Sequence, residues 1–344
     1  MAHLRIGTRG SQLALWQANA VAALLRDKTR TECDVVVIKT TGDRMAEARL
    51  SQIGGKRLFV KEIEDALLAG DVDLAVHSSK DMPAVLPEGL TIAAVLPRED
   101  ARDAIVLPQP AAPRGAASEK AGSGPGDEVA AVQAIVEQLG RAPRIGTSSV
   151  RRVAQLTRLF PGATFGPIRG NLDTRLRKLD SGEFDAIVLA SAGLRRLGQG
   201  HRISVALPID ACVPAPGQGI VAVEIRDDDR ATASLLASIN DQQAAIALEA
   251  ERAVVRKLGG GCQMPIGAYA EIGGGTRRGS DSISVKAIVV STDGARAAHA
   301  DVAGRADEAA AAGAAAAEQL IERGADAILA EVERQQAAVE GLQP

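Results

Sequence analysis

Two stretches of this chain recur later in the chain, in the same order. Arg5-Ile6-Gly7-Thr8 returns as Arg144-Ile145-Gly146-Thr147, and each copy precedes a hydroxyl-rich loop and then a helical pattern. Residues 70–79 return as 182–191, with Gly, Asp, Val and Ser at the same four of ten places. Strand-turn-helix segments often look alike, so one such repeat alone would decide little. Two repeats in the same order predict two lobes of similar build.

The amino-terminal part of the chain alternates strand and helix patterns. Residues 3–8 and 73–77 are short apolar runs of the kind buried in parallel sheets, and residues 35–40 are rich in β-branched side chains. Between them, apolar residues recur at helical spacing over 13–25 and 59–68. These βαβ units predict an α/β fold.

The composition changes along the rest of the chain. Residues 108–126 are rich in Pro, Ala, Gly and Ser, which predicts a flexible insertion, and 127–139 have the pattern of a short amphipathic helix. A chain of 344 residues is expected to form two or three domains, and the segment after Asp241 predicts a small α+β domain. The elements predicted there are a helix over 245–258, strands over 266–272, 282–291 and 298–303, and an Ala-rich helical stretch from residue 307.

Charge and composition exclude several classes of protein. A net charge of −3 and an aromatic content of 2% argue against a nucleic-acid-binding protein, which needs a basic surface and stacking platforms. No apolar stretch is long enough to span a membrane, and residues 1–10 lack the apolar core of a signal peptide. Three cysteines without Cys-x-x-Cys spacing and four scattered histidines predict reduced thiols in the cytoplasm and no metal site.

Basic and hydroxyl side chains gather in the loops that follow the predicted strands. Such loops offer backbone N–H groups and the positive end of a helix dipole, and in a two-lobed α/β protein they converge on one cleft. Guanidinium groups bind carboxylates through paired hydrogen bonds, and no phosphate-binding glycine motif is present, so a ligand with several carboxylates is predicted. The alternative is that these arginines are merely exposed. The residues concerned are Arg9, Ser11, Ser78, Ser79, Lys80, Thr147, Ser148, Ser149, Arg151, Arg152, Arg169, Arg175, Arg195 and Arg196.

Asp81 and Cys262 differ in character from these cationic loops. Asp81 would repel an acidic ligand unless it acts as an acid–base group that stabilises a developing cation on the substrate; the alternative is a helix cap or an ion pair with Lys80. Cys262 directly follows three glycines, which places a thiol on a pliable loop where a bulky group could attach. The alternative, a small buried hydrophobic residue, is what we expect for Cys33 and Cys212.

The motifs that hold these residues stand in a characteristic order. They are Ile6-Gly7-Thr8-Arg9-Gly10-Ser11, Ala14-Leu15-Trp16-Gln17, Gly54-Gly55-Lys56-Arg57-Leu58-Phe59-Val60-Lys61-Glu62, His77-Ser78-Ser79-Lys80-Asp81-Met82-Pro83, Gly146-Thr147-Ser148-Ser149-Val150-Arg151-Arg152, Arg169-Gly170-Asn171, Ala190-Ser191-Ala192-Gly193-Leu194, Pro214-Ala215-Pro216-Gly217-Gln218-Gly219 and Gly261-Cys262. Together they resemble the hydroxymethylbilane synthases, also called porphobilinogen deaminases, along nearly the whole chain. The match is only loose beyond Gly273, and the segment 108–142 is longer than we expect for compact members of the family.

The resemblance implies three α/β domains, of which two resemble the lobes of type II periplasmic binding proteins. It also implies that the chain returns to the first lobe after crossing into the second. The predicted domains are 1–100 plus 214–238 (domain 1), 101–213 with the insertion at about 108–142 (domain 2), and 239–344 (domain 3, α+β, with the cofactor cysteine).

The resemblance further implies a transferase of tetrapyrrole (haem) biosynthesis. It joins four porphobilinogen molecules head to tail on a dipyrromethane primer, which a thioether attaches to Cys262, and releases ammonia at each step. Asp81 matches the catalytic carboxylate that serves the leaving amine, the azafulvenium cation and the α-proton; water finally releases hydroxymethylbilane. Positions implied to bind cofactor or substrate or to shape the site are Arg9, Ser11, Lys56, Phe59, Ser78, Lys80, Thr147, Ser148, Ser149, Arg151, Arg152, Arg169, Arg175, Ala190, Gly193, Arg196 and Gln218.

A different function remains open from the residues alone. A non-catalytic carboxylate-binding protein with the same two lobes would explain the arginines, but it needs neither Asp81 nor Cys262. The family resemblance favours the enzyme, with porphobilinogen as its small-molecule partner, no nucleic acid or membrane partner, and a monomeric state.

Overall fold

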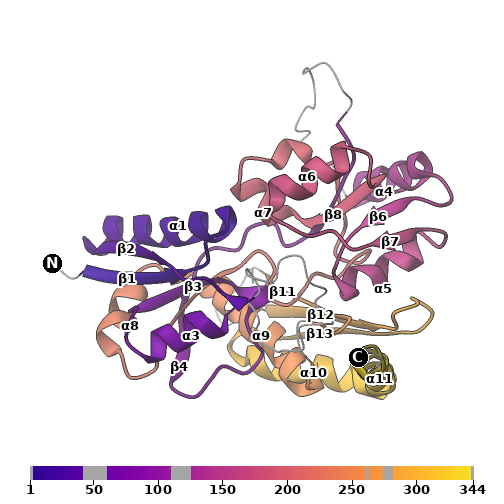
Figure 1. Ribbon diagram of the computed structural model, residues 1–344. Helices are drawn as coiled ribbons and strands as arrows, with labels where there is room; N and C mark the ends of the chain where they lie inside the picture. The colour runs from indigo at the N-terminus through magenta and orange to yellow at the C-terminus, as the bar shows by residue number, and fades with distance from the viewer. Residues whose placement is uncertain (1–2, 42–59, 110–124, 261–262, 274–281, 342–344) are drawn as a thin grey trace.

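The protein consists of two α/β lobes and a smaller third domain, each built on its own β-sheet (Figure 1). The computed structural model describes residues 3–41, 60–109, 125–260, 263–273 and 282–341. No helix in these ranges has the length and apolarity that crossing a membrane requires. The predicted α/β class, with two lobes and a small C-terminal domain, is confirmed.

Lobe 1 is a five-stranded sheet covered by helices. Its elements are β1 (His3–Thr8), α1 (Gln12–Thr29), β2 (Glu32–Val37), α3 (Lys61–Leu68), β3 (Leu74–Ser78), the 3-10 turn η2 (Ser79–Asp81), β4 (Leu90–Val95), β10 (Val221–Arg226) and α8 (Arg230–Leu236). The strand order is β2-β1-β3-β10-β4, in which β1 is parallel to β2 and β3, whereas β10 is antiparallel to its neighbours. Alternation along β3 places Leu74 and Val76 in the core under α1, and Ala75 in the core under α3.

Lobe 2 repeats this arrangement. Its elements are β5 (Asp103–Val106), α4 (Pro125–Leu139), β6 (Arg144–Gly146), α5 (Val150–Leu159), β7 (Thr164–Gly166), α6 (Leu172–Asp180), β8 (Ala186–Ala190), α7 (Ser191–Arg196), the 3-10 turn η3 (Gly200–Arg202) and β9 (Val205–Ala206). The strand order is β7-β6-β8-β5-β9; β6 is parallel to β7 and β8, and β5 is antiparallel to β8 and β9. Each lobe therefore has three parallel strands followed by an antiparallel fourth strand, as two similar lobes require.

The two lobes are joined by two segments of the chain that run side by side. The first crossing segment, residues 96–102, leads from β4 into β5, and the second, residues 213–220, leads back into β10. They are held together by backbone hydrogen bonds from Glu99 N to Gly219 O (3.0 Å) and from Leu96 N to Val221 O (3.0 Å). The antiparallel strand of each sheet is thus the strand that follows a crossing. The predicted domain limits at residues 100, 213 and 238 remain a prediction.

The repeated sequence corresponds to a repeated set of contacts. Arg5 on β1 bonds Asp73 through its backbone N (2.8 Å) and its guanidinium (2.7 Å), and Asp73 N donates back to Arg5 O (2.9 Å). Arg144 on β6 makes the same bonds with Asp185, at 2.8, 2.8 and 2.9 Å. In each lobe the contacts fix the register between the first and third parallel strands. The same arginine also bonds the carbonyl of a glycine with positive φ, which is Gly70 in lobe 1 and Gly182 in lobe 2.

Two sequence predictions in the lobes need adjustment. The strand predicted over 35–40 is β2, which begins at Glu32 and ends at Val37 because it pairs residue by residue with β1. The amphipathic helix predicted over 127–139 is α4, and its residues Val132 and Ile135 lie in the core of lobe 2. The rest of the predicted insertion, 110–124, lies outside the described residues.

The C-terminal domain is an antiparallel sheet backed by helices rich in small residues. Its elements are α9 (Gln242–Leu258), β11 (Ile266–Gly273), β12 (Ser282–Val290), β13 (Ala297–Arg305), the 3-10 turn η4 (Ala306–Glu308), α10 (Ala309–Glu322) and α11 (Ala325–Gly341). The predicted helix and strands are found, with small shifts at their ends. Alanine in the shared core lets α9 and α10 approach closely: a Cβ added at Gly313 would lie 2.1 Å from Ala250 O.

Gly313→Ala is expected to destabilise the C-terminal domain. Alanine is favoured over glycine by about 1 kcal/mol inside a helix, but the contact with the Ala250 carbonyl is far below van der Waals distance. Forcing α9 and α10 apart costs about 1–3 kcal/mol, so the packing loss outweighs the propensity gain. Thermal unfolding should show a lower midpoint for Gly313→Ala than for Ala311→Ser on the exposed face of the same helix. An unchanged or raised midpoint would contradict this packing.

Candidate active site

The loops at the carboxyl ends of the parallel strands carry most of the predicted site residues. Ser11 follows β1 and caps α1, where its side chain accepts a hydrogen bond from Ala14 N (3.3 Å). Lys80 and Asp81 lie in η2, directly after β3. In lobe 2, Ser149 follows β6 and caps α5, and Asn171 follows β7 and caps α6. These ends of the strands lie along one edge of each sheet, as the fold dictates.

Asp81 lies at the end of a tight turn that is anchored to the second crossing segment. Ser79 N donates to Ile220 O (3.0 Å), and Met82 N donates to Ser79 O (3.2 Å). Asp81 is partly exposed and lines a pocket in lobe 1. The predicted site residues Arg9, Ser11 and Ser78 line the same pocket, together with Gln17, whose side chain donates to Ser78 Oγ (2.8 Å).

Charges from lobe 2 face Asp81. The pKa of Arg175 is lowered to about 10, because burial and the positive charges of Arg152 and Arg169 together outweigh the negative charge of Asp81, which raises it. Asp81 of lobe 1 and the two arginines of lobe 2 therefore each lie close enough to Arg175 for the charges to interact. Arg175 is positioned by a bond from its Nε to Gly170 O (2.9 Å) at the start of α6. The described structure thus brings one carboxylate of lobe 1 together with several guanidinium groups of lobe 2.

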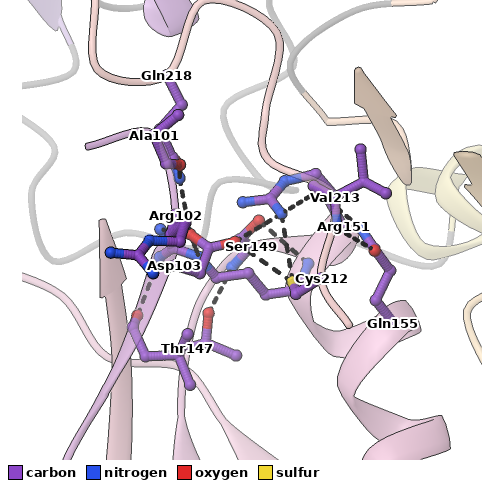
Figure 2. A network of polar contacts seen from close by, with 12 residues as sticks. Ala101, Arg102, Asp103, Thr147, Ser149, Arg151, Gln155, Cys212, Val213 and Gln218 are labelled. Carbon is purple, nitrogen blue, oxygen red and sulfur yellow. Dashed lines mark hydrogen bonds and ion pairs between the residues drawn. The ribbon is translucent and has the colours of Figure 1, made fainter. Parts of the chain in front are cut away.

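The side chains of Arg151 and Arg152 are buried and paired within the protein, which the sequence did not indicate. Both are buried in the first turn of α5 and both pair with Asp103. Arg152 pairs through Nη2 (2.7 Å), and Arg151 pairs through Nη1 (2.7 Å), as Figure 2 shows for Arg151. They also donate to backbone carbonyls, Arg151 to Val213 O (2.7 Å) and Arg152 to Val188 O (2.9 Å). That they bind carboxylates of a ligand directly stays a prediction. The alternative of merely exposed arginines is wrong for this pair.

The sequence analysis did not identify Asp103 as a site residue. It is the last residue of the charged run Arg98-Glu99-Asp100-Ala101-Arg102-Asp103 and the first residue of a fully buried strand. A carboxylate at the start of an apolar strand requires a buried cation, which is the signal that could have identified it. The two arginines lower the pKa of Asp103 far below its usual range despite its burial.

The hydroxyl residues of the β6–α5 loop shape the loop itself. Ser149 Oγ accepts from Arg152 N (3.4 Å), and Thr147 Oγ1 accepts from Ser149 N (3.3 Å). Ser148 Oγ donates to Ile168 O (2.9 Å) and accepts from Ile168 N (3.1 Å), which ties this loop to the loop after β7. The predicted role of these residues in holding a ligand remains a prediction, and their described bonds position the cationic loops.

Arg196 and Gly193 lie on α7, where lobe 2 meets lobe 1. Arg196 donates to Gly219 O (2.7 Å) in the second crossing segment, and its guanidinium lies 5.6 Å from the ring centre of Trp16 on α1. A Cβ added at Gly193 would lie 3.7 Å from Leu13, and Ala190 is the residue before this helix. Burial lowers the pKa of Arg196. The α7 residues of the predicted site therefore bridge the two lobes.

Lys80 joins the η2 turn to the crossing segments. Its Nζ lies 3.3 Å from Gln218 Oε1, and the buried Gln218 in turn donates to Ala101 O (2.6 Å). The pKa of Lys80 is lowered to about 8, because desolvation and the charges of Arg152 and Arg151 together outweigh the opposing effect of Asp81 and Asp103. An amine with this pKa is charged at neutral pH and loses its charge in mildly alkaline solution.

Lys80 is expected to titrate well below other lysines. In protein without a primer, for which Cys262→Ser serves, competitive acylation and peptide mass spectrometry should give a midpoint near pH 8 for Lys80. Model lysine peptides acylated alongside the protein, whose amines titrate at about 10.4, are the reference. A midpoint for Lys80 equal to theirs would contradict the buried cationic surroundings described above.

The family of the chain follows from its sequence match. Residues 4–234 match the family profile described as "Porphobilinogen deaminase, dipyromethane cofactor binding domain", and residues 245–322 match "Porphobilinogen deaminase, C-terminal domain". The chain belongs to the porphobilinogen deaminase family. The family assignment made from the ordered motifs is therefore confirmed.

Individual relatives match nearly end to end. The porphobilinogen deaminase of Geobacillus kaustophilus is 45% identical over 337 residues, which cover 97% of this chain and 99% of the relative. That of Syntrophobacter fumaroxidans is 43% identical over 332 residues, covering 96% and 98%. Among solved structures, an ancestral cationic amino acid solute binding protein aligns over 69% of this chain and 88% of its own, with 15% identity and a TM-score of 0.40. So distant a likeness carries no weight, and the fold rests on the strand order above.

The described residues fit the dipyrromethane cofactor of the family, an acidic pair of pyrrole rings held by a cysteine. A second pocket, where both lobes meet the C-terminal domain, is lined by Lys80, Ser149 and Arg252 on its polar side. Ser79 and Arg151 also line it, and Ser79 Oγ and Arg151 Nε are buried without a hydrogen-bond partner among the described residues. Unsatisfied donors beside cationic groups suit the carboxylates of such a ligand. Among the described residues, no group of histidine, cysteine and acidic side chains suits a metal ion.

Two of the three cysteines are poorly placed for attaching a cofactor. Cys212 is fully buried beside Asp103, and burial raises the pKa of its thiol to about 12. Cys33 lies near the amino-terminal end of β2, packed against the lobe 1 core, and burial raises its pKa as well. Cys262 lies outside the described residues, as do Lys56 and Phe59, but Met264, just after it, lines the second pocket. Attachment at Cys262 is therefore the assignment that the surroundings favour.

Proposed function

We propose that this chain is a hydroxymethylbilane synthase that joins four porphobilinogen molecules head to tail and then hydrolyses the linear tetrapyrrole free. The observation that supports the proposal is that one carboxylate, Asp81, acts on the charge of Arg175, on which Arg152 and Arg169 also act, and directly follows Lys80 in η2. Porphobilinogen carries two carboxylates and an aminomethyl group, so it needs cations for its acid groups and one anion for its reacting carbon. Both are present in this site.

The cationic groups bind and orient the acid groups of the growing chain. Arg175 is held at its Nε by Gly170 O, which sets the plane in which its terminal nitrogens present hydrogen bonds. Arg9 and Asp81 line the same lobe 1 pocket, so Arg9 of lobe 1 and Arg175 of lobe 2 can bind acid groups of one chain together. Paired hydrogen bonds from a planar guanidinium fix a carboxylate in direction as well as in position.

Asp81 acts on the reacting carbon. Its carboxylate holds the proton on the leaving amine, faces the cation that remains when the carbon–nitrogen bond breaks and ammonia leaves, and then takes the α-proton after attack by the neighbouring pyrrole. A preorganised anion beside a developing positive charge stabilises the transition state. The turn of η2, held to Ile220 O, keeps this carboxylate in place.

The cysteine-bound dipyrromethane supplies, when present, a covalent primer with a free end for the first pyrrole unit. Cys262 attaches it through a thioether, and the second pocket, with Lys80, Ser149 and Arg252, offers partners for its acid groups. A non-catalytic carboxylate-binding protein would also use the arginines, but it would need neither Asp81 nor a cofactor cysteine. A cytoplasmic monomer completes the proposal; the sparse cysteines without paired spacing support the reducing compartment.

Turnover of porphobilinogen tests the proposal. The purified protein should consume porphobilinogen, release one ammonia per pyrrole consumed, and yield a linear tetrapyrrole that mass spectrometry detects. The same protein with porphobilinogen withheld is the control. Saturable binding of porphobilinogen without consumption, by folded protein that carries its primer, would instead support the carboxylate-binding alternative.

A further inference from the structure

Asp103 is the shared acceptor of the polar network between the lobes. Besides the two arginines, its Oδ1 accepts from Gln218 Nε2 (2.9 Å) and its Oδ2 accepts from Cys212 Sγ (3.3 Å) (Figure 2). The carboxylate has no solvent-exposed surface. Both carboxylate oxygens therefore accept their hydrogen bonds from other groups of the protein.

The network around Asp103 connects both lobes and the second crossing segment. Asp103 itself follows the first crossing segment, and Gln218 lies in the second. Arg151 and Arg152 belong to the first turn of α5 in lobe 2. Through Gln218 Oε1 the network reaches Lys80 in lobe 1, the residue immediately before Asp81. One buried anion therefore sets the geometry of cations that come from opposite lobes.

We propose that Asp103 is a positioning residue, which holds the guanidinium groups of Arg151 and Arg152 and, through Gln218, the ammonium of Lys80 in the arrangement that receives the acid groups of the pyrrole chain. The inference rests on the proposed function, because it assigns how the acid-binding cations of that site are placed. Asp103 does not touch the substrate; it acts through its neighbours.

The charge balance of the network supports this role. Three cations, Lys80, Arg151 and Arg152, surround the single buried anion, so the network keeps an excess of positive charge for an acidic ligand. Asp103 also raises the pKa of Lys80, in opposition to burial and the two arginines. Removing its charge leaves the cations to repel one another, which moves them apart and lowers the pKa of Lys80 further.

Asp103→Asn, which keeps the shape of the side chain and removes its charge, tests the proposal. The primed variant is expected to show a KM for porphobilinogen raised about tenfold or more, with a smaller fall in kcat. In primer-free protein, the acylation midpoint of Lys80 should fall below the value of about 8 in the parent. The matched control is Asp185→Asn, which removes an aspartate paired with Arg144 at the other end of the same lobe. It should change neither KM nor the Lys80 midpoint, although it can lower the stability.

A purely structural Asp103 would lower the unfolding temperature and leave both readouts unchanged. A folded Asp103→Asn variant with the parental KM or the parental Lys80 midpoint therefore overturns the proposal. If Asp103→Asn does not fold, Gln218→Met decides instead, because it keeps the charge of Asp103 and removes the hydrogen bonds that link Asp103 to Lys80, together with the bond from Gln218 to Ala101 O. A raised KM with a lowered midpoint supports the proposal, and parental values overturn it. The titration of Lys80 needs no turnover, so its result is independent of whether the proposed function holds; a parent that does not consume porphobilinogen refutes that function alone.

Discussion

Asp81→Asn is expected to reduce the rate of porphobilinogen consumption by about 10²–10⁴-fold, the usual contribution of a positioned acid–base group. The amide keeps the size of the side chain but can neither take up a proton nor balance the cation that forms at the reacting carbon. Because Asp81 is partly exposed at the end of η2, we expect the Asp81→Asn variant to fold normally. Stopped or steady-state assays of ammonia release measure the loss directly.

The controls for Asp81 separate chemistry from assembly. Intact mass should show that Asp81→Asn still carries its dipyrromethane, because the acid-binding cations and the cofactor cysteine are unchanged. Asp27→Asn, on the exposed face of α1, should keep the parental rate. Full turnover by Asp81→Asn would remove this carboxylate from the mechanism.

Cys262→Ser is expected to abolish both the covalent adduct and turnover. A serine hydroxyl is a far weaker nucleophile than a thiolate, so no thioether or stable equivalent forms. Intact mass of the parent should exceed the mass of the bare chain by the two pyrrole units of the primer, and that of Cys262→Ser should equal the bare chain. The assay of porphobilinogen consumption should give only background for the variant.

Cys33→Ser provides the matched thiol control for Cys262. Cys33 is only half-buried on β2 and remote in sequence from the active-site loops, so its replacement should leave adduct and turnover intact. Cys212 is a less suitable control because its thiol belongs to the Asp103 network. An adduct that persists in Cys262→Ser and vanishes in Cys33→Ser would place the primer on β2 of lobe 1 and would contradict attachment at Cys262.

The repeated segments show what the sequence could predict about the fold. Arg5 and Asp73 recur as Arg144 and Asp185 because the same strand-to-strand contact is built twice, and such a contact leaves its mark on local sequence. The antiparallel strands β5 and β10 leave no comparable mark. Their place in each sheet depends on where the chain crosses between lobes, and that is a long-range property. The family resemblance, not local pattern, predicted the return of the chain to lobe 1.

The site was predictable in its residue types more than in its contacts. Clusters of arginine after strands indicated a carboxylate-binding cleft, and the charges of Asp81, Arg152 and Arg169 do act on Arg175. Sequence could not show that Arg151 and Arg152 are paired inside the protein, because their partner Asp103 precedes them by nearly 50 residues, a stretch that includes α4 and β6. Which residues bond within the protein and which meet the ligand is decided by packing.

Intact mass spectrometry of the unmodified protein, before and after a limiting amount of porphobilinogen, tests the central claim most directly. The account predicts a starting mass that includes one dipyrromethane, and then a series of species heavier by successive single pyrrole units that disappears as the linear tetrapyrrole is released. Folded protein that carries the primer but shows no heavier species, while porphobilinogen remains unconsumed, would contradict it.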